Sequence, residues 1–164
     1  MSVSIFHLEM CDPERFEPVP LPSEWTMTTL RPAQPELNLA FYRDVGANWN
    51  WTDRLSWTDA TWRDYVDRDA PHTWVARMDD KPVGYFELEA QESGSVEIAI
   101  FGLLSDFIGQ GLGAVLLSAA IQTAWEIPGT RRLWVHTCTD DHEHALANYK
   151  KRGFTLFKTD TPTP

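Results

Sequence analysis

The sequence predicts an α/β fold of the α+β type, in which about four helices flank a mixed, mostly antiparallel sheet of about seven strands. Two patterns lead to this prediction. Three strand patterns follow one another over residues 72–104 with turns between them, as in an antiparallel meander, and strand and helix patterns alternate afterwards. The chain has 164 residues, of which 43% are hydrophobic, so a single domain can bury a substantial core without metals or disulfides.

The first part of the chain contains both strand and helix patterns. Residues 1–25 join a short apolar stretch to a run rich in proline and acids, which predicts an extra strand and an irregular arm ahead of the main domain, residues 26–164. Within the domain, β-branched residues predict a strand and helical spacing of apolar residues predicts two helices. A capping box of Ser56 and Asp59 is expected to start the second helix. These elements are a strand over 26–32, a helix over 35–45 and a helix over 56–69.

Strand and helix patterns alternate after the meander. A broadly apolar helix is predicted from Gly109 to about Ile127, where a Pro-Gly dipeptide ends it. A later short helix has a basic last turn, which suits the helix dipole, and Gly153 as its stop. The elements after the apolar helix are a strand over 131–139, a helix over 143–152 and a strand over 154–158.

The charge and the cysteine content limit the classes of partner. The formal net charge is −10, with 24 acids against 14 bases, which argues against nucleic acid or an anionic membrane as partner because both require basic patches. Cys11 and Cys138 give no disulfide framework. The N-terminus lacks the basic start and long apolar core of a secretory signal, and no run approaches the length of a membrane span. A cytoplasmic protein is therefore expected.

The stretch FIGQGLGAVLL, residues 107–117, places three glycines directly before the apolar helix. Glycines at a helix start allow an anion such as a phosphate to approach unpaired backbone N–H groups, although a tight turn for helix packing explains them as well. Gly109, Gly111 and Ala114 formally fit a dinucleotide fingerprint, with Asp140 at the end of the next strand. In a dinucleotide site the first glycine follows its strand almost directly, and further βαβ units come after it. Here several residues separate the strand from Gly109 and the remaining chain is too short for those units, which argues against such a site. A Walker loop fails because no Lys-Ser or Lys-Thr follows.

Two motifs and the order of elements resemble the GNAT superfamily of acyl-CoA-dependent N-acyltransferases. The strand, loop and helix over residues 96–117 resemble the pyrophosphate-binding motif of the family, with Gly111 and Gly113 on its glycines. Ile108 stands where the family has Arg or Gln, which removes a side-chain donor and leaves the backbone donors intact. The resemblance covers roughly residues 26–160, as judged from the order of strand and helix patterns.

The second motif lies near the C-terminus. Ala145, Tyr149, Gly153 and Phe154 match the pattern of the family, whereas His142 stands where the family often has Asn. In the family this tyrosine approaches the sulfur of coenzyme A as general acid, so the resemblance gives Tyr149 that role, with a structural hydroxyl as the alternative. The resemblance also makes His142 a candidate hydrogen-bond partner of the cofactor, although a histidine at a helix start is commonly plain surface.

The resemblance implies how acetyl-CoA would be bound. The family splays the strand before the glycine loop away from its neighbour, so that free backbone groups pair with pantetheine and with the thioester oxygen. Counting back from the glycines assigns these main-chain roles to Phe101 and Leu103. The pyrophosphate would lie on backbone N–H groups of the glycine loop, and no metal is required. The residues of this loop are Gly109, Gln110, Gly111, Leu112, Gly113 and Ala114.

Glu97 is the one ionisable residue in the run VEIAIFGLL, and burial of an unpaired carboxylate is costly. It occupies the position where some family members carry a general base, acting directly or through water, with a solvent-facing glutamate as the alternative. Strand alternation predicts that Glu97, Ala99, Phe101 and Leu103 share one face if no bulge intervenes.

The loop NWNWTDR, between the first two helices, is the candidate wall of an acceptor site. Trp49 and Trp51 offer aromatic faces to a cation or an aromatic acceptor, and Asp53 offers a counter-charge, although most tryptophans serve packing. The leading hypothesis is an N-acetyltransferase that moves an acetyl group from acetyl-CoA to a primary amine of a small molecule or peptide in a ternary complex. A non-catalytic acyl-CoA-binding module is the alternative, a nucleotide-dependent oxidoreductase comes third, and a homodimer is possible.

Overall fold

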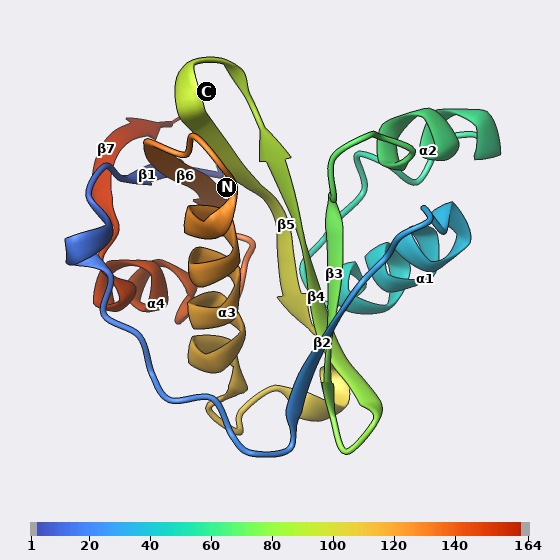
Figure 1. Ribbon diagram of the computed structural model, residues 1–164, viewed down its shortest axis with the longest axis horizontal. Helices are drawn as coiled ribbons and strands as arrows, with labels where there is room; N and C mark the ends of the chain where they lie inside the picture. The colour runs from blue at the N-terminus through green and yellow to red at the C-terminus, as the bar shows by residue number, and fades with distance from the viewer. Residues whose placement is uncertain (1–2, 162–164) are drawn as a thin grey trace.

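The computed structural model describes residues 3–161, which form one sheet with helices on both faces (Figure 1). The strands are β1 (Ile5–Met10), β2 (Trp25–Thr29), β3 (Thr73–Met78), β4 (Lys81–Ala90), β5 (Ser95–Leu103), β6 (Arg132–Cys138) and β7 (Thr155–Asp160). The helices are α1 (Pro35–Gly46), α2 (Asp59–Val66), α3 (Leu112–Glu126) and α4 (Ala145–Arg152). Three short 3₁₀ turns are η1 (Pro13–Arg15), η2 (Glu92–Gly94) and η3 (Ser105–Phe107).

The seven strands are arranged in the order β2-β3-β4-β5-β6-β1-β7. Every neighbouring pair is antiparallel except β5 and β6, which are parallel. Helices α3 and α4 lie on one face of this sheet and α1 and α2 on the other (Figure 1). The predicted fold class, a mixed and mostly antiparallel sheet with four flanking helices, is therefore confirmed.

The N-terminal segment is joined to the sheet and to the helices of one face. Strand β1 lies between β6 and β7 and pairs with both of them. The arm that follows runs past α4 and α3 toward β2 (Figure 1). Along this path the N–H of Glu17 donates to the carbonyl of Arg152 at 3.0 Å, and the N–H of Val19 donates to the Ser118 hydroxyl at 3.0 Å. Backbone hydrogen bonds therefore fasten the arm to both helices.

Two of the predicted helix starts are wrong. Helix α2 begins at Asp59, and Thr58 caps it by accepting a hydrogen bond from the N–H of Thr61 at 3.1 Å, so the expected capping box at Ser56 is not formed. Helix α3 begins at Leu112 because the preceding glycines are left-handed, with φ of +86° at Gly109 and +78° at Gly111. A backbone in this region cannot continue a right-handed helix.

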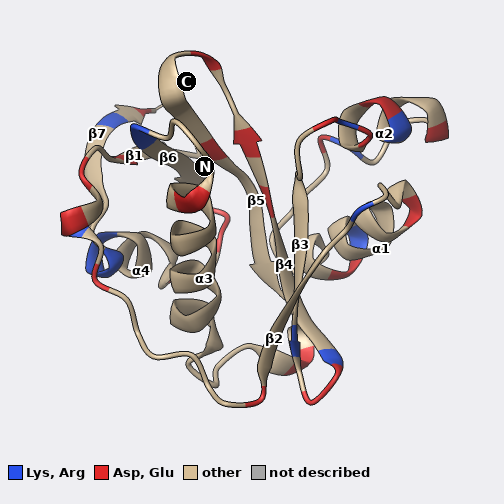
Figure 2. Ribbon diagram, in the orientation of Figure 1, with Lys and Arg blue, Asp and Glu red and all other residues tan. Residues whose placement is uncertain are grey.

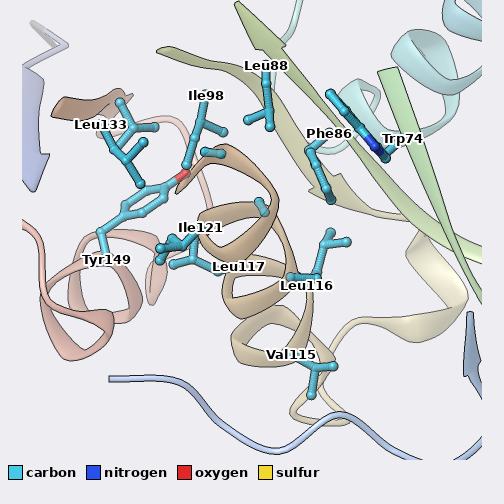
Figure 3. Packing of buried hydrophobic residues seen from close by; sticks show 14 of the residues in the cluster. Trp74, Phe86, Leu88, Ile98, Val115, Leu116, Leu117, Ile121, Leu133 and Tyr149 are labelled. Atoms are coloured by element: carbon cyan, nitrogen blue, oxygen red, sulfur yellow. The ribbon is translucent and has the colours of Figure 1, made fainter. Parts of the chain in front are cut away.

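Helix α3 forms the centre of the core on its face of the sheet. Its single charged residue is Glu126 at the C-terminal end (Figure 2), and Leu116, Leu117, Ala120 and Ile121 are completely buried. Figure 3 shows Leu116, Leu117 and Ile121 facing residues of β4, β5 and β6. With 15 residues α3 is still short for a bilayer, and no helix within residues 3–161 is long and apolar enough to cross a membrane.

Strand β5 contains a bulge that changes which side chains share a face. Glu87 and Leu88 of β4 are consecutive, yet they pair with Ile100 and Ile98 of β5, so Ala99 is an extra residue. Ile98 and the later Phe101 both pack into the core below α3. The expectation that Glu97 shares a face with Phe101 and Leu103 is therefore wrong, because one inserted residue reverses the alternation.

A buried polar network joins β4 to the helices of the opposite face. Glu87 is fully buried, and its carboxylate accepts hydrogen bonds from Arg54 at 3.0 Å, Tyr65 at 2.8 Å and Asn38 at 3.0 Å. The side chain of Asn38 also donates to the Thr73 hydroxyl. Three donors around one carboxylate satisfy a charge that could not otherwise stay in the interior.

His72 borders this network and is 3% exposed, with its Nε2 buried and unpaired within residues 3–161. Burial lowers the pKa of His72 from 6.5 to about 4. The unfolded chain therefore binds a proton between these two values while the folded protein does not, so stability falls as the pH drops from 6.5 toward 4.

We expect this histidine to contribute roughly 3 kcal/mol of acid destabilisation below pH 4, the equivalent of its pKa shift. His72→Phe keeps a ring against Tyr65 and removes the titration, so the variant should lose less stability than the wild type between pH 7 and pH 4.5. Urea denaturation at several pH values measures the difference. Equal pH slopes for both proteins would contradict the assignment to His72.

Candidate active site

Strands β5 and β6 part shortly after they meet, which opens the sheet. Their parallel pairing is limited to Ser95, Val96 and Glu97 on β5, opposite Arg132, Leu133 and Trp134 on β6. From Ile98 onward β5 pairs with β4 alone, while β6 continues beside β1. Figure 1 shows the two strands diverging on either side of α3. The backbone groups of residues 98–103 that face β6 thus have no strand partner, as the resemblance implied.

The space between the parted strands is a cleft of about 1060 Å³ that reaches both faces of the sheet. On the α3 face its walls include the glycine loop and α4, and on the other face they include the α1–α2 loop. Nearly all of the residues predicted for the site line this one cleft. They are Trp49, Trp51, Asp53, Glu97, Phe101, Leu103, Gly109, Gly111, Gly113, Ala114, His142 and Tyr149.

Two predicted residues do not line the cleft. The Gln110 side chain donates to the carbonyl of Asp106 at 3.0 Å and closes the loop on itself, and the Leu112 side chain is 8% exposed in the core. Both can contribute a main-chain N–H, which is all that the prediction requires of them.

The start of α3 presents backbone donors to the cleft. No side chain caps this helix, and the first N–H groups of a helix have no intrahelical acceptor. A methyl group built on Gly109 or Gly111 would meet no atom within 4 Å, whereas one on Gly113 would meet only Asn148 and Leu103 at 3.8 and 4.0 Å. The loop therefore leaves open space above donors at the positive end of the helix dipole, as a bound anion requires.

Tyr149 approaches the cleft from α4. Its ring lies among Leu117, Ile121 and Leu133, and in Figure 3 its hydroxyl is directed toward Ile98, where β5 and β6 separate. The residue is 6% exposed, and within residues 3–161 no hydrogen bond contributes to the pKa of its hydroxyl. Burial, with a smaller contribution from the charge of Asp141, raises the pKa of Tyr149. The phenol is therefore protonated at neutral pH and free to donate.

Glu97 approaches the cleft from the other face of the sheet. Its carboxylate accepts a hydrogen bond from the Gln91 side chain at 3.0 Å, and the Gln91 oxygen in turn accepts from the indole N–H of Trp134 at 2.9 Å. Because an indole only donates, this contact fixes which end of the Gln91 amide faces Glu97. Burial and the neighbouring charge of Glu89 raise the pKa of Glu97. Such a carboxylate is a stronger proton acceptor than an exposed one.

The α1–α2 loop forms the wall opposite Glu97. Trp49 meets His142 of the β6–α4 loop in an edge contact, with 5.3 Å between ring centroids. Trp51 packs more deeply, against Tyr42 and in the space left by Gly46, and Asp53 is exposed. Both indoles are half-buried, and both pack against the core cluster that contains Val45 and Tyr85.

Sequence reasoning missed Arg54, which fixes this loop to the sheet. The guanidinium pairs with Glu87 at 3.0 Å and lies between 4.4 and 5.6 Å from the centroids of four aromatic rings. These rings belong to Tyr42, Trp57, Trp62 and Tyr65. Glu87 stands in the mostly apolar run VGYFELEA. A carboxylate buried in such a strand needs a partner, so this position could have indicated that a basic side chain from another part of the chain pairs with it.

A family model described as the acetyltransferase (GNAT) family matches residues 30–154. The chain therefore belongs to the GNAT family of acetyltransferases, as the two motifs suggested. A search of curated protein sequences found no match. Within residues 3–161, no three His, Cys, Asp or Glu side chains lie close enough together to hold a metal ion.

Solved structures of this family share the fold. A GCN5-related N-acetyltransferase from Sphaerobacter thermophilus has a TM-score of 0.74 at 16% identity, over 96% of this chain and 50% of that one. A GCN5-related N-acetyltransferase from Kribbella flavida has a TM-score of 0.65 at 22% identity, over 97% and 56%. Ard1 from Thermoplasma volcanium has a TM-score of 0.61 at 20% identity, over 82% and 85%. The chain spans about half the length of the first two.

Proposed function

We propose that this protein is an N-acetyltransferase that transfers an acetyl group from acetyl-CoA to the primary amine of a small molecule or peptide by direct attack in a ternary complex. The observation that carries the proposal is the cleft that joins the glycine loop on one face of the sheet to Glu97 on the other. A donor and an acceptor that enter from opposite faces would meet between the parted strands. This geometry favours direct transfer of the acetyl group between two bound substrates. A module that only binds acyl-CoA would need access from one face of the sheet.

The glycine loop suits the diphosphate of coenzyme A. The uncapped N–H groups at the start of α3, from Gly111 to Ala114, are donors of the kind that hold a pyrophosphate, and no side chain crosses the space above Gly111. Such a site needs no net positive charge, which reconciles an anionic donor with a protein of net charge −10. The free backbone groups of Phe101 and Leu103 on β5 lie next along the cleft, where pantetheine and the thioester oxygen would follow.

The residues at the junction of the two faces supply acid and base chemistry. In this proposal Glu97 promotes loss of the proton from the acceptor ammonium, and the free amine attacks the thioester carbon. A C–N bond forms and the C–S bond breaks, a main-chain N–H of β5 stabilises the oxygen, and Tyr149 gives its phenolic proton to the leaving thiolate. The nitrogen gives up its second proton to solvent as the C–S bond breaks, Glu97 releases its proton to solvent, and Tyr149 regains one, so the net products are the amide, free coenzyme A and one proton.

The α1–α2 loop supports a cationic acceptor. Trp49 lines the cleft with a half-buried indole, and Asp53 is an exposed carboxylate that also lines it. A protonated amine is attracted both by an aromatic face and by a carboxylate. His142, in edge contact with Trp49, also lines the cleft and is a candidate hydrogen-bond partner for the donor.

The function is tested in two steps. Calorimetry should first detect binding of acetyl-CoA, and a panel of amines should then be screened for release of free thiol from acetyl-CoA. Heat on binding together with thiol release by at least one amine supports the transferase. Binding without release by any amine would favour the non-catalytic module, and absence of binding would overturn the proposal.

We expect Gly111→Ala to weaken acetyl-CoA binding roughly 10- to 100-fold, because a methyl group would occupy the space that the diphosphate needs above the backbone donors. Gly129→Ala is the matched control. Gly129 has a similar φ of +83°, also meets nothing within 4 Å and lies outside the cleft, so both variants carry the same backbone strain. Equal affinities in the two variants would argue against binding at the loop.

A further inference from the structure

The face of the sheet that carries Glu97 also carries a histidine that sequence reasoning did not single out. Leu133 and Val135 of β6 are buried below α3, so the alternating Trp134 and His136 point to the opposite face. There Nδ1 of His136 lies 3.7 Å from a carboxylate oxygen of Glu97. Both residues line the cleft.

Resting on the proposed function, we propose that His136 is the group that takes the proton from the acceptor ammonium, and that Glu97 acts through it. The two side chains differ in access: the His136 side chain is 49% exposed, whereas that of Glu97 is 13% exposed. One oxygen of Glu97 is already held by Gln91, and the other faces His136. In this proposal the ring nitrogen toward Glu97 carries the hydrogen and Nε2 is the basic nitrogen.

The proton balance is complete without another reagent. Nε2 of His136 accepts a proton from the ammonium and becomes part of an imidazolium, whose charge the Glu97 carboxylate stabilises across 3.7 Å. The half-exposed ring then passes the proton to water. Glu97 is therefore a positioning residue in this scheme, held by Gln91, which Trp134 orients in turn.

The charged surroundings of His136 leave it neutral at pH 7. Burial and the neighbouring His7 of β1 lower its pKa, while Asp141 and Asp53, from the loops on either side of the cleft, act in the opposite direction. His7 is itself paired with Asp160 of β7 at 2.9 Å. With the net shift downward from 6.5, the base form of His136 is populated at neutral pH, and kcat/KM should rise with pH through a midpoint below 6.5.

The experiment compares His136→Asn and Glu97→Gln with the wild type, after acetyl-CoA binding to the wild-type protein has been shown. We expect His136→Asn to keep acetyl-CoA affinity within about twofold, to lose roughly 100-fold in kcat/KM for the acceptor and to lose the acidic limb of the pH profile. Added imidazole should restore part of the rate. His144 of the β6–α4 loop also lines the cleft but is 75% exposed and pairs with Glu143, so His144→Asn is the control for a cleft histidine away from Glu97 and should keep the acidic limb.

Glu97→Gln separates the two possible bases. If His136 takes the proton, this variant stays active, and its acidic limb moves to lower pH because the imidazolium has lost a stabilising charge. An inactive Glu97→Gln beside an active His136→Asn would make Glu97 the base and overturn the proposal. An unchanged rate in His136→Asn would also overturn the assignment of His136 as the base. Neither result bears on the proposed transferase function, which fails only if the wild-type protein shows no acetyl-CoA binding or no turnover.

Discussion

We expect Tyr149→Phe to lower kcat by roughly 10²- to 10⁴-fold, the usual contribution of a general acid, while acetyl-CoA affinity changes little. Tyr149 is 6% exposed and within residues 3–161 no hydrogen bond contributes to the pKa of its hydroxyl, so we expect the loss of this hydroxyl to cost little stability. Stability should therefore stay within about 0.5 kcal/mol of the wild type. Turnover at saturating substrates, calorimetry with acetyl-CoA and urea denaturation together separate a catalytic hydroxyl from a structural one.

Tyr85→Phe is the control for this change. Tyr85 is completely buried outside the cleft, and its hydroxyl lacks a partner within the described chain. Removing an unsatisfied buried hydroxyl is neutral or stabilising, so this variant should keep full turnover. Full turnover in Tyr149→Phe as well would remove Tyr149 from the mechanism.

Arg54→Met is expected to reduce the free energy of unfolding by about 3–5 kcal/mol. The guanidinium is 12% exposed and the carboxylate of Glu87 is not exposed at all, so the variant leaves a negative charge in the interior without its cation. Because Arg54 also fixes the α1–α2 loop to β4, acceptor binding should weaken with stability. Urea denaturation measures the first effect, and the KM for an acceptor measures the second.

Two further variants separate the buried charge from the lost packing. Combining Arg54→Met with Glu87→Leu removes both charges and should recover much of the lost stability. Lys158→Met breaks an exposed pair with Asp160, in which the side chains are 58% and 48% exposed, and should cost at most about 1 kcal/mol. If the single Arg54 variant were no worse than the Lys158 variant, Glu87 would not depend on its cation.

The fold and the glycine loop beside the cleft could be predicted because local chemistry decides them. Periodicity predicts the strands and helices, and the glycines before α3 adopt the positive φ that glycine tolerates best. The resemblance to the family predicted that β5 separates from β6, a feature of the backbone that the side chains of these strands do not reveal. Roles for Glu97 and Tyr149 remain predictions that the proposed variants test.

The part of the cleft around Glu97 depends on tertiary contacts that no local sequence pattern reveals. The bulge at Ala99 leaves no signature in the run VEIAIFGLL, yet it moves Glu97 to the face opposite Phe101. Arg54 and Glu87 are 33 residues apart in sequence, so their pairing is a product of the tertiary fold. The partnership of Glu97 with His136 likewise arises from the register of β5 and β6.

The position of β1 has a consequence for how the chain folds. Ile5 pairs with Cys138 on one side and with Asp160 on the other, so the first strand joins partners that are more than a hundred residues away along the sequence. In the sheet, β7 has β1 as its neighbour. That half of the protein has a high contact order, and such pairings form slowly because a long loop must close first. During synthesis, β1 therefore has neither of its neighbours in the sheet until β6 and β7 have left the ribosome.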